Sequence, residues 1–560
     1  MGRSTKTETD ILIVGGGVSG VCAAIQAARM EARVLLVEET PWLGGMLTSA
    51  GVSAVDGNHL LPSGLWGEFR QALYDYYGGP QAVATGWVSH TLFEPHVGER
   101  ILRGMVTAQP NIVVCSGFHI INVLKADDRV TGAVFADEQG NHMTVIACVT
   151  IEATEFGDVL PLAGCQYRIG REASWETGES QAPAEPDDII QDLTYVAILK
   201  DYGTGSARII PEPPGYQPEM FDGTCRELST QPNEHIPDAQ QMLNYGRLPN
   251  AKYMINWPRC GNDYYLNLVE MSRAERHRAV IKAKYHTLSW IHFVQTRGGF
   301  RNLGLAEDEF PTPDRLALIP YIRESRRIIG QYRLTLPDLE HFYDSPRGAF
   351  YQNGIAVGDY PLDHHHQQSP RPVDEEYPPI WAFTVPYGCL VPIEIDGLLV
   401  AEKSIAVTHY VNGCTRLQPV VMLIGQAAGA AAALCLRTNC QPREINVHRL
   451  QQVLLDAGAY LMPFSDTPVT DPDFQVLQKS GVIGLLKGKR IPHTWINETK
   501  FLPENQVTQM ELEEISSILA RQGVQLALED LTRATRGFTR RHLARWIDQH
   551  FDLFNELKTE

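Results

Sequence analysis

Several signals that often reveal a function directly are missing from this chain of 560 residues. None of its ten cysteines forms a Cys-x-x-Cys pair, which excludes a zinc ribbon and a dithiol redox motif. Basic residues are in deficit, with 48 Lys and Arg against 66 Asp and Glu. The resulting net charge of −18 argues against nucleic acid or an anionic membrane as the main partner.

Long apolar runs are missing as well. Residues 1–10 are mostly polar and lack the apolar stretch of a secretory signal. The longest apolar run, Val420–Leu436, contains Gln426 and is shorter than the roughly 20 residues that a bilayer requires, which predicts a buried helix. Together with the scattered single cysteines, this leads us to expect a cytoplasmic protein without a membrane partner. Apolar residues still make up 44% of the chain, enough for a large core.

A glycine-rich turn stands between a strand and a helix near the N-terminus. The apolar run Ile11–Val14 predicts a buried parallel strand, and the segment Gly15-Gly16-Gly17-Val18-Ser19-Gly20 follows it directly. A helix-forming stretch comes next, then a second apolar strand, Arg33–Val37, which Glu38 ends. This is the pattern that binds a dinucleotide, because the glycines admit a pyrophosphate, the helix N-terminus faces its charge and the acid accepts ribose hydroxyls.

The pair Gly44-Gly45 follows Glu38 and distinguishes FAD from NAD. Here the sequence resembles FAD-dependent oxidoreductases of the glutathione-reductase-like superfamily, in which a glycine pair follows the acidic residue in this way. The resemblance implies non-covalent FAD as the cofactor. No second Gly-x-Gly-x-x-Gly follows a strand, so a separate nicotinamide-binding domain is not expected. At Ile151–Asp158 the superfamily usually has Ala-Thr-Gly-Asp, whereas this chain has Glu155 where glycine is commonest.

A second group of motifs lies much further along the chain. Val400–Ser404, Thr415–Pro419 and the run Gly425-Gln426-Ala427-Ala428 resemble those of an FAD-dependent oxidoreductase family whose bacterial members are often labelled xanthan-lyase-like. The resemblance covers about residues 8–465 and implies that this segment returns to complete the flavin site. We expect Gly425 to open a helix whose N-terminus stabilises negative charge on reduced flavin. The alternative is a closely packed core helix.

These patterns predict an α/β fold: a Rossmann-like FAD-binding domain interleaved with an α+β substrate domain, plus a small C-terminal helical region. The predicted parts are 8–165 and 385–465 for the FAD-binding domain, 166–384 for the substrate domain and 466–560 for the helical appendage. Residues 274–296 are predicted to form one long amphipathic helix, and residues 334–374 a loop that roofs the site.

The motifs and the resemblance together give candidate residues for cofactor binding. They are Gly15, Gly17, Val18, Ser19, Gly20, Glu38, Glu39, Gly44, Gly45, Met46, His119, Ala153, Thr154, Glu402, Arg416, Gln418, Gly425, Gln426, Ala427 and Ala428.

Candidate catalytic residues are His409, Arg416, Tyr387 and Arg323. Flavin enzymes need a group that moves a proton and cations that fix the substrate. His409 and Arg416 occupy a stretch in which fumarate-reductase-like flavoproteins, similar in outline, carry a His and an Arg that hold substrate. The alternatives are a core histidine for His409, an ion-pair network for Arg323 and a buried tyrosine with a backbone partner for Tyr387.

Two other patterns are less informative. On a helix, Arg323, Arg326 and Arg327 would share one face. His364-His365-His366 resembles a metal site, but consecutive residues rarely all point at one ion, so no metal is expected.

The sequence thus predicts an FAD-dependent oxidoreductase, an oxidase or dehydrogenase, that takes a hydride from a small polar substrate. Without a nicotinamide domain, its electron acceptor would be oxygen or a quinone-like carrier. Two alternatives stay open: a flavin-dependent monooxygenase or halogenase that uses an external reductant, and a non-catalytic flavin-binding protein. The chain is a possible homo-oligomer.

Overall fold

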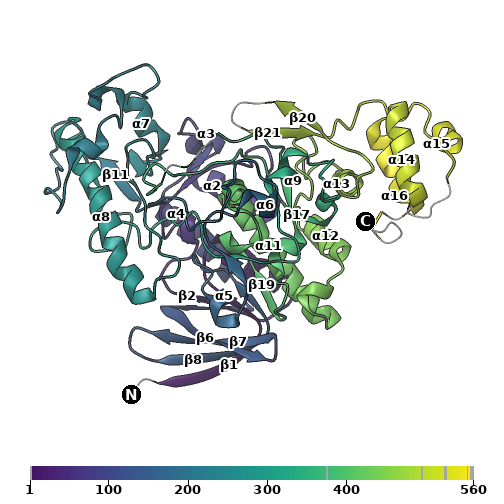
Figure 1. Ribbon diagram of the computed structural model, residues 1–560, viewed down its shortest axis with the longest axis horizontal. Coiled ribbons are helices and arrows are strands. Elements are labelled where there is room, and N and C mark those ends of the chain that lie inside the picture. Colours follow the sequence, from purple (N-terminus) through teal and green to yellow (C-terminus); the bar gives the residue numbers. More distant parts are fainter. Residues whose placement is uncertain are drawn as a thin grey trace.

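A seven-stranded sheet is the base of the molecule (Figure 1). The computed structural model describes residues 3–371, 373, 376–492, 496–521, 526–551 and 553–554. The parallel strands of the sheet are β5 (Ile112–Ser116), β2 (Val34–Glu38), β1 (Ser4–Val14), β8 (His142–Glu152) and β19 (Leu398–Val400). Two antiparallel strands, β7 (Arg129–Asp137) and β6 (Phe118–Ala126), continue the sheet from β8.

Two distant parts of the sequence meet in this sheet. Strand β19 pairs in parallel with β8, which places Leu398 opposite Thr150 and Val400 opposite Glu152. The carboxyl ends of β1, β2, β8 and β19 therefore lie at one edge, where α/β sheets bind their ligands. The Rossmann-like α/β fold predicted from the sequence is confirmed, while the bounds of the four predicted segments stay predictions.

Helices cover the sheet and the region around it. From the first half of the chain these are α1 (Val18–Arg29), α2 (Gly64–Tyr77), α3 (Pro80–Val83), α4 (Pro95–Thr107) and α5 (Val159–Ala163), with the short strands β3 (Ala54–Val55) and β4 (Thr91–Leu92). From the returning segment they are α10 (His409–Thr415), α11 (Gln418–Thr438) and α12 (Val447–Asp456).

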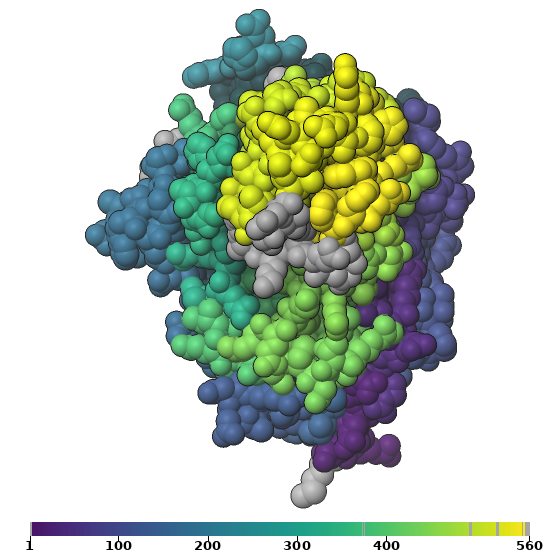
Figure 2. Space-filling view, turned by 90° about the vertical axis from the view of Figure 1, so that its right-hand side faces the viewer, coloured from purple at the N-terminus to yellow at the C-terminus, as the bar shows by residue number. Residues whose placement is uncertain are grey.

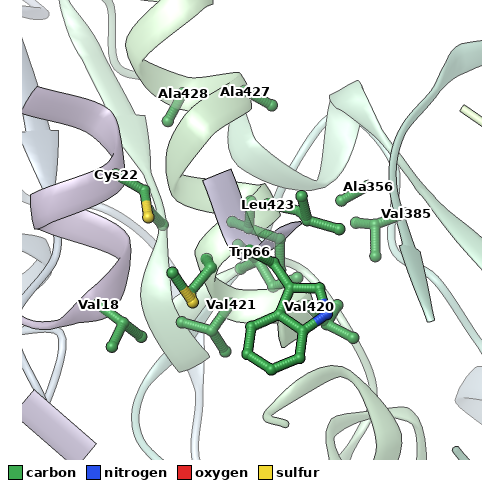
Figure 3. Packing of buried hydrophobic residues seen from close by; sticks show 14 of the residues in the cluster. Val18, Cys22, Trp66, Ala356, Val385, Val420, Val421, Leu423, Ala427 and Ala428 are labelled. Carbon is green, nitrogen blue, oxygen red and sulfur yellow. The ribbon is translucent and has the colours of Figure 1, made fainter. Parts of the chain in front are cut away.

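Helix α11 contains the longest apolar run of the chain. Among the described residues it is the one helix that meets the length and composition of a membrane span, yet 94% of its most apolar stretch is buried inside the protein. It packs against α1, where Figure 3 shows Val18 and Cys22 beside Val421 and Ala428. The buried helix predicted for 420–436 is confirmed.

In the sequence, a region of small sheets and helices lies between strands β8 and β19. Its strands are β9 (Tyr167–Arg168), β10 (Leu193–Thr194), β11 (Ala197–Asp201), β12 (Arg247–Leu248), β13 (Lys252–Ile255), β14 (Asp263–Tyr264), β15 (Leu303–Leu305), β16 (Arg327–Ile328), β17 (Gly354–Gly358) and β18 (Phe383–Pro386). Its helices are α6 (Ser174–Thr177), α7 (Ala239–Tyr245), α8 (Arg273–Thr296) and α9 (Leu336–Glu340).

Two predictions for this region have different outcomes. The long helix expected at 274–296 is α8, which Ser272 and Glu275 begin with a capping box. The loop expected over 334–374 is more ordered than predicted, since it contains α9 and β17, and β17 pairs with β18. Within that range, Pro372 and Asp374 lie outside the described residues.

The C-terminal part forms a block at one end of the molecule (Figure 1), which faces the viewer in yellow-green to yellow in Figure 2. Its helices are α13 (Phe474–Val482), α14 (Gln509–Arg521), α15 (Leu528–Ala534) and α16 (Arg540–Phe551). Leu512, Ile515 and Leu519 are buried on one face of α14. This part also contains an antiparallel pair of strands, β20 (Lys489–Pro492) and β21 (Asn497–Lys500). The sequence analysis predicted a helical region here and no strands.

Candidate functional site

The glycine turn joins the end of β1 to the start of α1. Gly15 has a φ of 105°, in the left-handed region that favours glycine, and a Cβ there would overlap the carbonyl oxygen of Ala153. A Cβ on Gly20 would likewise overlap the carbonyl oxygen of Gly15. Helix α1 starts at Val18, and its N-cap residue Gly17 has no side chain to cap it, a feature typical of turns whose N–H groups bind an anion. One of these groups, the Ser19 N–H, donates to Glu402 Oε2 at 3.4 Å.

Glu38 closes the turn from the neighbouring strand. The backbone N–H of Gly16 donates to Glu38 Oε2 at 2.6 Å, and that of Thr40 donates to Oε1 at 2.8 Å. Burial raises the pKa of Glu38 to about 7, although both hydrogen bonds favour the ionised form. The carboxyl group is thus fixed at the end of β2, where a ribose hydroxyl would meet it.

A cavity of about 690 Å³ opens at this edge of the sheet. Eight of the predicted cofactor-binding residues line it: Gly15, Gly17, Glu38, Glu39, Gly45, His119, Ala153 and Thr154. The lining also includes Leu318, Ile319, Pro320 and Ile322, together with Arg273, Arg276 and Arg326, none of which was predicted as a cofactor residue. Pockets of 300–1,000 Å³ are typical of small-molecule and cofactor sites.

The returning segment contacts the glycine turn through a buried ionic group. Ser19 Oγ donates to Glu402 Oε2 at 2.5 Å, and Lys403 Nζ donates to Glu402 Oε1 and to Glu155 Oε2, each at 2.7 Å. Lys403 is completely buried, and its pKa is raised because the two carboxylates outweigh the cost of burial. Glu155, the departure from the usual glycine, is therefore one half of an ion pair that joins the two parts of the chain.

Residues 425–428 do not open a helix, which corrects the sequence prediction. Helix α11 begins at Gln418, with Pro419 in its first turn, so Gly425 lies about two turns inside it. A Cβ on Gly425 would overlap the backbone of Ser19, because α11 packs closely on α1 here (Figure 3). The small residues allow close helix packing, which was the alternative interpretation of this run as a core helix. Gln426, Ala427 and Ala428 do not line the cavity.

Seven other predicted cofactor residues also lie outside the lining: Val18, Ser19, Gly20, Gly44, Met46, Glu402 and Gln418. Ser19 and Glu402 bond to each other behind the turn, and Gln418 Nε2 donates to the carbonyl oxygen of Ala54 at 3.1 Å.

The residues present fit FAD. Gly15 and Gly17 of the turn line the cavity without side chains, and the Glu38 carboxyl group lies at the end of β2, where this fold binds a ribose. Glu155 Oε1 is buried without a hydrogen-bond partner and lies against Gly45, within the lining of the cavity. A hydroxylated chain such as ribityl would satisfy that oxygen, whereas an apolar ligand would leave it unpaired.

A charged cluster lies next to the cavity, behind Pro320 and Ile322. Arg416 Nη1 donates to the Tyr321 hydroxyl at 2.8 Å, and Nη2 donates to Asp363 Oδ2 at 2.8 Å. Arg416 is 2% exposed, whereas the Asp363 side chain is 36% exposed, so one face of this pair remains accessible. Arg416 is not a lining residue itself, but its partner Tyr321 lies between two residues that are.

Arg323 belongs to the same cluster. Its guanidinium lies 3.2 Å from Asp263 Oδ1 and donates to Thr194 Oγ1 at 2.9 Å. His365 Nδ1 contacts the other Asp263 oxygen at 2.5 Å. Asp263, Tyr321, Asp363 and His365 were not among the candidate site residues, although His365 belongs to the histidine run considered above.

The three arginines do not share a helical face, which corrects that expectation. Residues 321–326 have no helical structure, and Arg327 is in β16. Arg326 pairs with Asp158 and Glu270, and Arg327 with Glu172 and Glu324. The proline-containing segment before them extends the chain along the cavity.

The two remaining catalytic candidates are held by other groups. His409 is fully buried and its Nδ1 lies 3.0 Å from Glu324. Tyr387 is 3% exposed and its hydroxyl donates to the carbonyl oxygen of Pro442 at 2.8 Å. Neither residue lines the cavity.

The fold and the cavity are those of a protein that binds a flavin dinucleotide at the carboxyl edge of a parallel sheet. The family model "FAD dependent oxidoreductase" matches residues 10–454, so the chain belongs to the FAD-dependent oxidoreductase family and FAD is its cofactor.

Curated relatives are similar over short segments only. The sarcosine oxidase subunit alpha of Corynebacterium sp. (strain U-96) is 47% identical over 49 residues, which are 9% of this chain and 5% of that protein. The carotenoid phi-ring synthase of Chlorobaculum tepidum is 29% identical over 102 residues, 18% of this chain and 15% of that protein.

Two solved structures align with nearly the whole chain at low identity. A geranylgeranyl bacteriochlorophyll reductase-like protein of Thermoplasma acidophilum is 10% identical with a TM-score of 0.35, covering 98% of this chain and 97% of its own. The flavin-dependent brominase Bmp2 is 11% identical with a TM-score of 0.35, covering 98% and 99%.

Proposed function

We propose that this oxidoreductase removes a hydride from a small polar substrate and passes the electrons to oxygen or a quinone-like acceptor. FAD, when bound, supplies the hydride acceptor. The narrower glutathione-reductase-like and xanthan-lyase-like relationships rest on the motif resemblance, and no lyase chemistry follows from these residues.

One observation carries the proposal. The Arg416 guanidinium is fixed by Tyr321 and Asp363 beside the cavity, and its Nε is buried without a partner. A buried unpaired donor is costly unless a ligand accepts from it. A carboxylate or hydroxyl oxygen of a substrate is the group that a guanidinium prefers.

The other charged groups prepare the cluster for such a substrate. Arg323 provides a second guanidinium, and its Nε is also buried without a partner. Asp263 holds Arg323 and His365 together, which fixes both side chains before a substrate arrives. Fixed donors favour binding because little side-chain freedom is lost when the substrate arrives.

An anaerobic reduction screen tests the proposal. The holoenzyme is mixed with amino acids, sugars and hydroxy acids, and bleaching of the flavin absorption bands is followed. Arg416→Gln should slow reduction by the active substrate at least about 100-fold, since a charge-assisted contact is lost. Arg443→Gln is the control, because Arg443 pairs with Asp396 on the surface, both about one-third exposed.

The outcomes separate the alternatives. Reduction by a polar metabolite that depends on Arg416 supports the proposal. Reduction by a reduced nicotinamide alone would point to a monooxygenase or halogenase and would overturn it. Equal rates for Arg416→Gln and Arg443→Gln would move the substrate site away from the charged cluster.

A further inference from the structure

Three buried histidines, His364, His366 and His409, meet on one side of the segment 363–366. Asp263 lies on the other side of that segment, next to His365. His364 and His366 come from the segment between β17 and β18, and His409 is the first residue of α10. They are 9%, 6% and 0% exposed, respectively. Their ring centroids lie 4.9 to 5.6 Å apart, and each offers a ring nitrogen within 4.8 Å of the other two.

The local backbone explains which histidines converge. Side chains alternate sides along an extended chain, so His364 and His366 point one way and His365 points the other, toward Asp263. The sequence argument against a metal assumed that all three consecutive residues would have to share one ion. In the structure only two of them converge, and the third member comes from a distant helix.

Hydrogen bonds fix where two of the three lone pairs lie. His364 Nε2 lies 3.0 Å from the carbonyl oxygen of Tyr410, and His409 Nδ1 lies 3.0 Å from Glu324. A neutral imidazole that donates from one nitrogen carries its lone pair on the other. That leaves His364 Nδ1 and His409 Nε2 as acceptors. A carboxylate behind a ligating histidine is a common outer partner in metal sites.

The free nitrogens have no partner of their own. His364 Nδ1, His409 Nε2 and both ring nitrogens of His366 are buried without a hydrogen bond. Each such group costs about 1–3 kcal/mol unless something satisfies it. One cation could satisfy a nitrogen from each ring at once.

The approach of the rings depends on a glycine. A Cβ on Gly413, in α10, would overlap His364 Nε2. Gly413 thus lets His364 pack directly on the helix that carries His409. A tetrahedral ion with bonds near 2.0–2.1 Å would hold its nitrogen ligands about 3.4 Å apart, within reach of small side-chain rotations.

We propose that His364, His366 and His409 bind one divalent transition-metal ion of the zinc class. Three neutral imidazoles leave the ion one open coordination position, as in zinc sites that bind water or a substrate. The other close group of possible ligands among the described residues, Glu94, His96 and Glu309, already surrounds Lys252 Nζ, which is 2.8 Å from Glu94 and 2.9 Å from Glu309.

Metal content and cobalt spectroscopy test the site in the FAD-loaded protein. The protein is stripped with a chelator, titrated with Zn²⁺ against a competing chelating dye, and analysed for bound metal. Wild-type protein should bind one equivalent. His366→Asn should weaken Zn²⁺ binding more than about 100-fold, because losing a ligand costs more than losing an outer partner. His365→Asn is the matched control, since that ring points away, and it should bind Zn²⁺ like the wild type.

Cobalt gives a readout that does not depend on any variant. Co²⁺ added to stripped wild-type protein should produce visible absorption bands of a four-coordinate site, and Zn²⁺ should abolish them. Retained flavin absorbance shows that a variant is folded. Wild-type protein that binds neither ion, or equal Zn²⁺ affinity in His366→Asn and His365→Asn, would overturn the proposal.

Discussion

Ser19 and Glu402 are 383 positions apart, yet the Ser19 hydroxyl donates to the Glu402 carboxylate at 2.5 Å. Ser19 is in the first turn of α1 and Glu402 follows β19, so this bond joins the glycine turn to the returning segment. Both residues are buried, and Glu402 also contacts Lys403. The two halves of the flavin-binding part are therefore held together at the point where the cofactor is expected.

Ser19→Ala should lower the stability of the protein by about 1–3 kcal/mol, because the buried Glu402 carboxylate loses a donor. FAD should also bind more weakly, since the turn and the returning segment are no longer tied together. Urea unfolding and FAD titration measure the two effects. Ser517→Ala on the exposed face of α14 is the control, as Ser517 only donates to the backbone of Glu513. Equal shifts for both variants would contradict the structural role of Ser19.

FAD affinity should depend on pH through Glu38. Burial raises the pKa of this carboxyl group to about 7 from its usual 4.5 in the protein without FAD, whereas a ribose hydroxyl donates best to the ionised form. Below pH 7, binding must therefore remove a proton, so the affinity should fall as pH falls, by up to about tenfold per pH unit. Above pH 7 it should level off.

Glu38→Gln separates this effect from other titrations. The amide cannot ionise, so the variant should bind FAD more weakly at pH 8 and lose the slope between pH 5 and 7. Fluorescence titration at each pH measures both. A slope that persists in Glu38→Gln would assign the pH dependence to another group.

Local sequence patterns predicted residues that the structure places at the cavity, and their contact with FAD stays a prediction. The glycine turn, Glu38 and the strand before Ala153 are set by short-range steric rules, and their residues line the cavity. The start of α11 was predicted wrongly, because small residues at Gly425 satisfy two requirements equally: an open helix N-terminus and close packing on another helix. Pro419 was the signal that distinguishes them, since proline favours the first helical turn.

Long-range electrostatics were beyond the sequence. The partners of Arg416, Arg323 and His409 come from segments more than fifty positions away, and no local pattern identifies them. No local pattern identifies the ion pair of Lys403 with Glu155 either. This ion pair explains why Glu155 replaces the glycine that is usual at this position.

Gly20→Ala should prevent the FAD-binding part from folding correctly, because its Cβ would overlap the backbone of Gly15. Backbone cannot move aside as a side chain can, so the expected result is insoluble or flavin-free protein. Gly104→Ala is the opposite case: it lies within α4 with no atom near its Cβ position. That variant should gain about 0.5–1 kcal/mol from better helix propensity and keep its flavin. Purified yield, flavin content and melting temperature distinguish them.

Lys252→Met should destabilise the protein by about 3–5 kcal/mol, since it leaves the buried carboxylates of Glu94 and Glu309 without their shared cation. Lys252 is 1% exposed, so water cannot replace it. Lys200→Met removes a lysine of the same region whose partner, Asp308, is half exposed, and should cost no more than about 1 kcal/mol. Urea unfolding of both variants measures the difference. If the two costs were equal, the buried group around Lys252 would contribute no more to stability than a surface ion pair. If an added divalent cation restored the stability of Lys252→Met, this would show that Glu94, His96 and Glu309 can bind an ion in place of the lysine.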